Sequence, residues 1–344
     1  MVTKKKSKLN AVINKRFSSI KKRRNNFLKR RPHRSFKLTR RRDYKRAWTV
    51  PGYWAFTNEV RLLMWSEKVL FFKFMVLYGL LSFLIVGLLS QENYKILEET
   101  VNELGGNVVA GELSSIVQNV AIFAGVLNGA FSVSLTESQQ IYVVILFLLS
   151  WMTLVWLLRQ IMAGHKNIKL RDGLYSSGTP LVATCIIFMV VLVQLIPFAL
   201  ALIAYGAAYG VNIFEDVLLT TLFWLVELLL VVISLYWITS SFLAMVVVTL
   251  PGMYPLKALK ASSDLVVGRR LRLLYRLAWL GLTIVMIWAV VILPAIVINS
   301  LSLLSAIPIV PVVALLLSAF TMVWFTSYIY LLYRKLVSDD AKPA

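Results

Sequence analysis

Long apolar runs with few charges recur six times along the chain. A helix that crosses the roughly 30 Å hydrocarbon core of a bilayer needs about 20 predominantly apolar residues. The six predicted spans are 69–89, 141–162, 181–208, 218–250, 277–298 and 308–333. None shows the strict alternation of a membrane β-strand. In lipid, every backbone N–H and C=O must be satisfied within the segment, so we expect each run to be an α-helix.

Loop charge sets the orientation of these spans. With six spans, one side of the membrane receives three connections that together carry thirteen Lys or Arg residues, and the other side receives three that carry one. The basic connections are 159–180, 250–276 and 334–344, and the opposite ones are 90–140, 209–217 and 299–307. Because basic loops are retained in the cytoplasm, we expect both termini and the three basic connections to be cytoplasmic.

The segment 116–135 is an alternative span. It is uncharged and has about the required length, but Gln118, Asn119 and Asn128 interrupt its apolar pattern. A seventh span here would move the first two basic connections to the outside, against the charge bias. We therefore predict a surface or re-entrant helix within the outer loop.

Composition favours the same class of fold. Hydrophobic residues make up 59% of the 344 positions, and mean hydropathy is +0.74. Charged residues make up 15%, against about 25% in soluble domains. The sequence therefore predicts an all-α, polytopic transmembrane helical bundle rather than a water-soluble fold.

Most of the net charge of +21 lies in residues 1–46, which hold 20 Lys or Arg and one acid, Asp43. Such a stretch repels itself and lacks the apolar residues to form a core, so we expect a disordered, basic cytoplasmic tail. It has no apolar region typical of a secretory signal. A mitochondrial presequence is a weaker alternative, because the tail is rich in Lys and shows no amphipathic period.

Two segments beside the spans predict amphipathic helices that lie in the headgroup layer. In 47–68, Trp54, Val60 and Leu63 are interleaved with charged residues, and 255–276 mixes leucines with six basic residues. Both patterns are typical of interfacial helices, and stiff linkers are the alternative. The expected organisation is a tail (1–46), an interfacial segment (47–68), a six-span membrane domain (69–337) and a cytoplasmic C-terminal tail (338–344).

Basic residues beside an anionic leaflet each contribute roughly 1 kcal/mol of binding. The residues that we expect to contact anionic lipid are Lys21, Lys22, Arg23, Arg24, Arg40, Arg41, Arg42, Arg269, Arg270 and Arg272. Basic and aromatic residues together also suit RNA, but tethering beside a membrane favours lipid over nucleic acid. Membrane lipids are therefore the expected partners, and a homo- or hetero-oligomer is left open.

One short pattern resembles a known family. The stretch VVTLPGMYPLKALKASSDLVVGRRLR (247–272) looks like the inner elbow of the bacterial glycerophosphodiester phosphodiesterase membrane-domain family. The matching residues are Pro251, Ala258, Leu259, Ser262, Gly268, Arg269 and Arg270. The segment RDGLYSSGTPL (171–181) is similar to an elbow in uncharacterised bacterial relatives. The resemblance implies a six-span, multi-pass protein of the bacterial plasma membrane and no particular activity.

The sequence contains no recognisable catalytic constellation. His33 lies in the tail and His165 in a basic connection, so neither is in a span. No zinc-protease, phosphate-loop or nucleophile-elbow motif occurs. Cys185 is the single cysteine, which excludes an internal disulfide and a multi-cysteine metal site. We therefore expect no enzyme activity, no cofactor and no metal.

Glu227 is the one acidic residue deep within a predicted span. It lies nine residues inside the outer end of 218–250, about 13 Å along the helix and near the bilayer midplane. An ionisable group there needs a partner or water, and Gln194 lies at similar depth in 181–208. Two interpretations follow, a proton or cation site, or a hydrogen bond that holds helices together.

These observations rank the possible functions. We expect a membrane protein of structural or envelope-maintenance type whose basic tail contacts anionic lipid. The alternative is a transporter or permease subunit with a midplane proton or cation site at Glu227.

Overall fold

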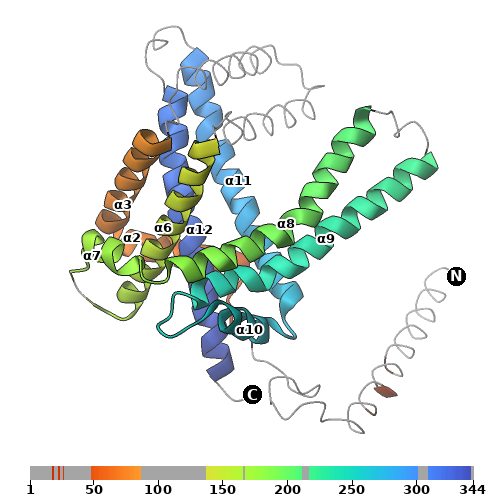
Figure 1. The fold of residues 1–344 in the computed structure, drawn as a ribbon, viewed down its shortest axis with the longest axis horizontal. Helices are drawn as coiled ribbons and strands as arrows, with labels where there is room; N and C mark the ends of the chain where they lie inside the picture. Colours follow the sequence, from red (N-terminus) through yellow and green to blue (C-terminus); the bar gives the residue numbers. More distant parts are fainter. Residues whose placement is uncertain are drawn as a thin grey trace, which may run out of the picture.

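The computed structural model describes residues 48–86, 137–165, 167–210, 217–300 and 309–341, and the single residues Ser18, Lys22, Arg23 and Asn26. Every regular element within these ranges is a helix (Figure 1). The helices are α2 (Tyr53–Ser66), α3 (Lys68–Leu81), the π-helix η2 (Ser82–Val86), α6 (Glu137–Met162), α7 (Leu170–Ser177), α8 (Leu181–Gly210), α9 (Val217–Val247), α10 (Pro255–Val266), α11 (Arg270–Ser300) and α12 (Ile309–Ala341). The prediction of an all-helical protein is confirmed for this part of the chain. The segment 116–135 lies outside it, as does the basic tail apart from those four residues.

Five predicted spans appear as helices long and apolar enough to cross a membrane, namely α6, α8, α9, α11 and α12. The remaining predicted span, 69–89, corresponds to α3 and η2, which continue one another as far as Val86. Its last three residues lie beyond the described part.

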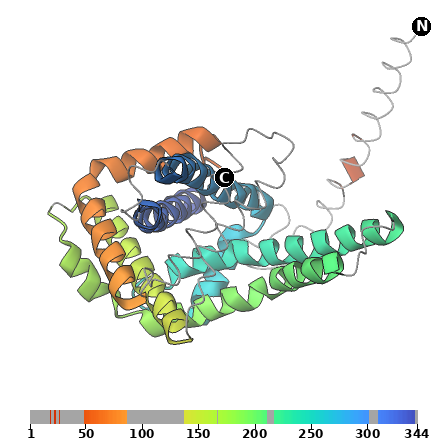
Figure 2. The ribbon, with the colours of Figure 1, turned by 90° about the horizontal axis from the view of Figure 1, so that it is seen from above.

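The helices divide into a bundle and a hairpin. Figure 1 shows α3, α6, α11 and α12 gathered together, with the α8–α9 hairpin leaning away from them, and Figure 2 shows the hairpin extending sideways. Burial is greatest in α6 and α12, where about half of the apolar stretch is buried (56% and 50%), against 17% of α8, 17% of α11 and 11% of α9. α6 and α12 therefore form the core, while most of the hairpin surface is available to lipid.

The bundle core is built around Trp151 on α6, which is completely buried. Its indole Nε1–H donates a hydrogen bond of 3.1 Å to the carbonyl of Met245 near the end of α9. Its ring contacts Phe147 and Phe325, with centroids 6.4 and 5.8 Å away. A single side chain thereby joins α6, α9 and α12.

One end of the molecule collects the contacts between sequence-distant segments. At this end Arg159 of α6 donates a 2.7 Å hydrogen bond to the hydroxyl of Thr249, just after α9. Asp339 of α12 accepts a hydrogen bond of 3.0 Å from the backbone N–H of Thr49, just before α2. The end of α6, the end of α9, the start of α2 and the end of α12 consequently lie on the same face of the protein.

Three local features differ from the sequence-based expectations. The connection 159–180 contains the short helix α7, in which Gly173 and Ser177 are buried. The amphipathic helix predicted over 255–276 ends at Val266, because Gly268 has a φ of +80° that breaks the helix. The predicted C-terminal tail, 338–344, is helical as far as Ala341.

Candidate functional site

The link between α10 and α11, residues 267–269, forms a sharp bend that we call the elbow. α10 begins at Pro255, whose ring suits a first helical position, and the chain leaves the helix at Val267. Gly268 adopts the left-handed conformation that glycine tolerates. The Leu273 N–H then bonds the Arg269 carbonyl at 3.1 Å, which starts α11. The first N–H groups of α11 consequently have no acceptor within their own helix.

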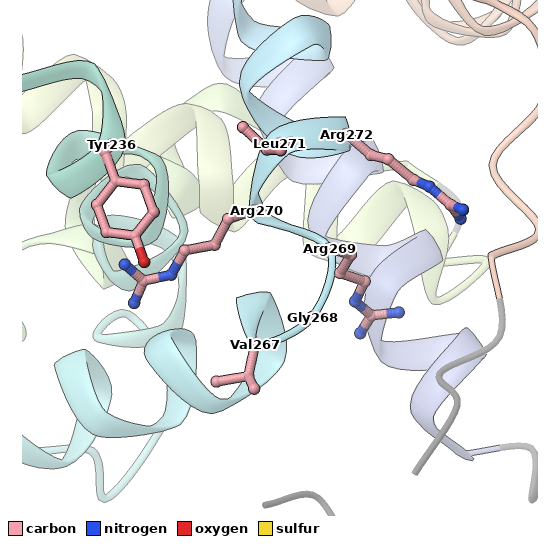
Figure 3. Close-up of a pocket in the computed structure, with 7 residues that line it drawn as sticks. All are labelled: Tyr236, Val267, Gly268, Arg269, Arg270, Leu271 and Arg272. Atoms are coloured by element: carbon pink, nitrogen blue, oxygen red, sulfur yellow. The ribbon is translucent and has the colours of Figure 1, made fainter. Parts of the chain in front are cut away.

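A pocket of about 590 Å³ lies at the elbow (Figure 3). It is lined by Tyr236 of α9 and by Val267, Gly268, Arg269, Arg270, Leu271 and Arg272. Figure 3 shows Arg270 extending toward Tyr236, with Arg269 and Arg272 on the other side of the linker. The three neighbouring arginines therefore enter three different environments.

Arg269 is buried and neutralised. Its guanidinium lies 2.7 Å from Asp340 and 3.9 Å from Asp339, and the side chains of Arg269 and Asp339 are only 3% and 1% exposed. Asp339 also accepts hydrogen bonds from the backbone N–H and the hydroxyl of Thr49. We call these four residues the Arg269 clamp. It fastens the elbow to the end of α12 and to the segment before α2.

Arg270 and Arg272 are held by aromatic rings instead. The Arg270 guanidinium lies 4.5 Å from the centroid of Tyr236, and one of its N–H groups donates a 3.3 Å hydrogen bond to Ser263. The Arg272 guanidinium lies 5.6 Å from the ring of Trp48. Neither makes an ion pair with a carboxylate among the described residues. Two cations at the pocket thus keep their charge uncompensated there.

Apolar side chains lie beside these cations. Tyr236, Val267 and Leu271 are 44%, 39% and 64% exposed. The start of α11 adds the partial positive charge of a helix N-terminus. A pocket that combines guanidinium groups with exposed apolar side chains fits the phosphate and adjoining chain of an amphiphile. The residues that line it include no His, Cys, Asp or Glu, and no group of three or more such side chains that could hold a metal ion occurs in the described ranges.

The other predicted lipid-contact residues lie in the tail. Lys22 and Arg23 are exposed single residues. The positions outside the described part are Lys21, Arg24, Arg40, Arg41 and Arg42. Trp48, the first residue of the continuous structure, contacts Arg272, so the chain that leads from the tail arrives at the rim of the pocket.

Glu227 and Gln194 occupy separate places in the α8–α9 seam. The side-chain oxygen of Gln194 accepts a 2.7 Å hydrogen bond from Ser241, and its backbone carbonyl accepts one of 2.6 Å from Ser234. Ser234 lies seven residues beyond Glu227, about 10 Å along the helix. The predicted pair is therefore not brought together by these contacts.

Arg276 is a buried cation that sequence reasoning missed. It is 5% exposed, donates a hydrogen bond to the Pro51 carbonyl and lies 4.2 Å from the ring of Tyr53. Its Nη1 has no hydrogen-bond partner. The aromatic residues Tyr53 and Phe56 in the first turn of α2 were the available signal, since rings attract guanidinium groups. Its contacts fix where the chain enters α2.

Comparisons with protein-family models, with curated proteins and with solved structures find no match for this chain.

Proposed function

We propose that this protein is a plasma-membrane protein of structural or envelope-maintenance type whose elbow pocket binds the phosphate headgroup of an anionic lipid. The proposal rests on two cations that lie beside exposed apolar side chains. Arg270 and Arg272 line the pocket and have no carboxylate partner among the described residues. Arg269 does not contact the lipid in this proposal. Its ion pairs in the clamp hold the elbow against the end of α12.

A six-span arrangement agrees with the contacts at one end of the molecule. Thr49 and Asp339 are in direct contact, which supports an even number of crossings between them, with the chain entering and leaving the membrane domain on the same face. Five helices are long and apolar enough to cross a membrane, and α3 with η2 would supply the sixth. A lone additional crossing by 116–135 would make the number odd and separate Thr49 from Asp339.

The distribution of charge supports a cytoplasmic position for this face. The end that holds the elbow carries the basic connections, and basic residues are retained inside. The anionic inner leaflet would then lie beside both the pocket and the tail of 20 basic residues. Arg270 and Arg272, on the two sides of the linker (Figure 3), would meet lipid phosphates while the tail attracts the surrounding leaflet.

Removing both uncompensated arginines should weaken anionic-lipid binding. We expect the Arg270→Ala, Arg272→Ala variant to lose roughly 30-fold in affinity for phosphatidylglycerol, because each arginine contributes roughly 1 kcal/mol. Native mass spectrometry of the full chain in detergent, titrated with phosphatidylglycerol, phosphatidylcholine or inorganic phosphate, measures this. Phosphatidylcholine binding should not change, and inorganic phosphate should bind far more weakly than the lipid because it lacks an apolar part.

The matched control is Lys257→Ala, Lys260→Ala, which removes the same charge from the exposed side of α10. It should retain most of the phosphatidylglycerol affinity. An equal loss in both variants would show that general surface charge, and not the pocket, attracts the lipid. An unchanged affinity in the arginine variant would refute the pocket altogether.

A transporter or permease subunit is the second candidate. The buried Oε1 of Glu227, which has no hydrogen-bond partner, favours it. Flux of a proton or cation that disappears in Glu227→Gln, in a protein that still folds, would support this function over the structural one.

A further inference from the structure

Three short helices occupy corresponding places in the fold. α2 leads into α3, α7 into α8 and α10 into α11, across breaks at 67, 178–180 and 267–269. Figure 1 shows the long helix of each pair leaving the end of the molecule that holds the elbow, and α6, α9 and α12 returning toward it. We call this end the elbow end, and we call α2, α7 and α10 the collar helices.

The collar helices lie beside the long helices and not beyond their ends. The hydroxyl of Ser177 on α7 lies 3.1 Å from that of Thr153, nine residues before the last residue of α6. The hydroxyl of Thr57 on α2 accepts a 3.0 Å hydrogen bond from the indole of Trp279, nine residues into α11. Nine helical residues span about 13 Å, and α10 likewise packs against α9. The outer faces of the collar helices therefore point sideways, where a bilayer would surround the long helices.

Large apolar side chains project from these outer faces. Trp65 of α2, Tyr175 of α7 and Leu256 of α10 are 70%, 90% and 81% exposed. Trp54, which is also exposed, lies about three turns from Trp65 along the same line of α2. Val60, an apolar residue of the amphipathic pattern expected for this segment, is instead fully buried in the protein core. The face of α2 that is available to a partner is thus the one with the two tryptophans.

Charged side chains accompany these apolar ones. The ammonium group of Lys68 lies 5.6 Å from the ring of Trp65. On another flank of α2, Glu59 forms a 3.2 Å ion pair with Lys335 near the end of α12. On α10, the exposed Lys257 directly follows the exposed leucine. Apolar and aromatic side chains beside basic ones are typical of helices that lie in the headgroup layer of a bilayer.

We propose that the collar helices form an interaction surface for the lipid headgroup layer at the elbow end, into which Trp65, Tyr175 and Leu256 insert. Two of them continue within three residues into α8 and α11, which are long and apolar enough to cross a membrane. This continuity holds their outer faces at the depth where interfacial aromatic side chains are favoured. The three side chains would then set how deeply the protein sits in the leaflet. This inference does not depend on the elbow pocket.

Spin labelling of the full chain in liposomes of phosphatidylglycerol and phosphatidylcholine tests the surface. In a Cys185→Ala background, the variants Trp65→Cys, Tyr175→Cys and Leu256→Cys each carry one nitroxide label. Collision rates are measured with molecular oxygen, which concentrates among acyl chains, and with a neutral nickel chelate, which stays in water. The matched controls are Ser66→Cys and Lys257→Cys, which place the label on exposed neighbours of two of these positions.

We expect the ratio of oxygen to nickel collisions to be several-fold higher at the three apolar positions than at the two controls. Nickel collisions as frequent as at the controls would overturn the proposal, because the outer faces would then be in water. Infrequent collisions with both reagents would also overturn it, since another protein chain and not lipid would cover the surface. All five labelled proteins should elute as the unlabelled protein does, because each replaced side chain is exposed.

Discussion

Replacing Arg269 with methionine is expected to lower the free energy of unfolding by about 3–5 kcal/mol, as for other buried ion pairs that lose one partner. The variant would leave Asp339, whose side chain is 1% exposed, and Asp340 beside each other without their cation. Methionine keeps much of the arginine's length, so the loss reports charge rather than volume. Thermal and denaturant unfolding of the detergent-purified protein measures the effect.

The neighbouring Arg270→Met variant is the matched control for this prediction. Arg270 is partly exposed and makes no ion pair within the described ranges, so we expect a loss of about 1 kcal/mol or less. Adding Asp339→Asn and Asp340→Asn to Arg269→Met should restore most of the stability, because the whole charge network is then removed. Similar losses for Arg269→Met and Arg270→Met would contradict a special role for the clamp.

Truncating Trp151 to alanine should also cost about 3 kcal/mol or more. The change empties a site between α6, α9 and α12 and leaves the Met245 carbonyl without its indole donor. Lipid is as apolar as the core, so the loss comes mainly from packing contacts and the hydrogen bond. The midpoint of thermal unfolding, followed by circular dichroism in one detergent, measures it.

Trp65, which is 70% exposed on α2, provides the comparison for the core tryptophan. Trp65→Ala removes the same side chain from the surface and should change the unfolding free energy by about 0.5 kcal/mol. If the two alanine variants unfolded at the same temperature, Trp151 would not be the centre of the core.

Hydropathy and length predicted the helices well because each span must satisfy its own backbone in lipid. That requirement acts locally, and five of the expected spans appear as helices long and apolar enough to cross a membrane. The helix α7 was missed because its eight residues, LRDGLYSS, contain only two leucines and form no apolar run. The divergence of the α8–α9 hairpin was also invisible, since lipid-facing and protein-facing positions are equally apolar.

The candidate site was only partly predictable. Three closely spaced arginines after Gly268 indicated the elbow. The sequence does not distinguish which of them is buried and which is exposed. Contacts with Asp339 and Asp340, some 70 residues away along the chain, decide that Arg269 is structural. Likewise, the similar depths of Glu227 and Gln194 suggested a pair. In the structure, Gln194 instead accepts hydrogen bonds from Ser234 and Ser241.

Side-specific labelling of introduced cysteines tests most directly whether the elbow end of a six-span protein faces the cytoplasm. In a Cys185→Ala background, single cysteines replace the exposed residues Ser66, Lys257 and Val337, which lie on α2, α10 and α12. A membrane-impermeant maleimide should label none of them in intact cells and all three in inside-out vesicles. Labelling of any one position from outside the intact cell would contradict the six-span topology and the cytoplasmic pocket together.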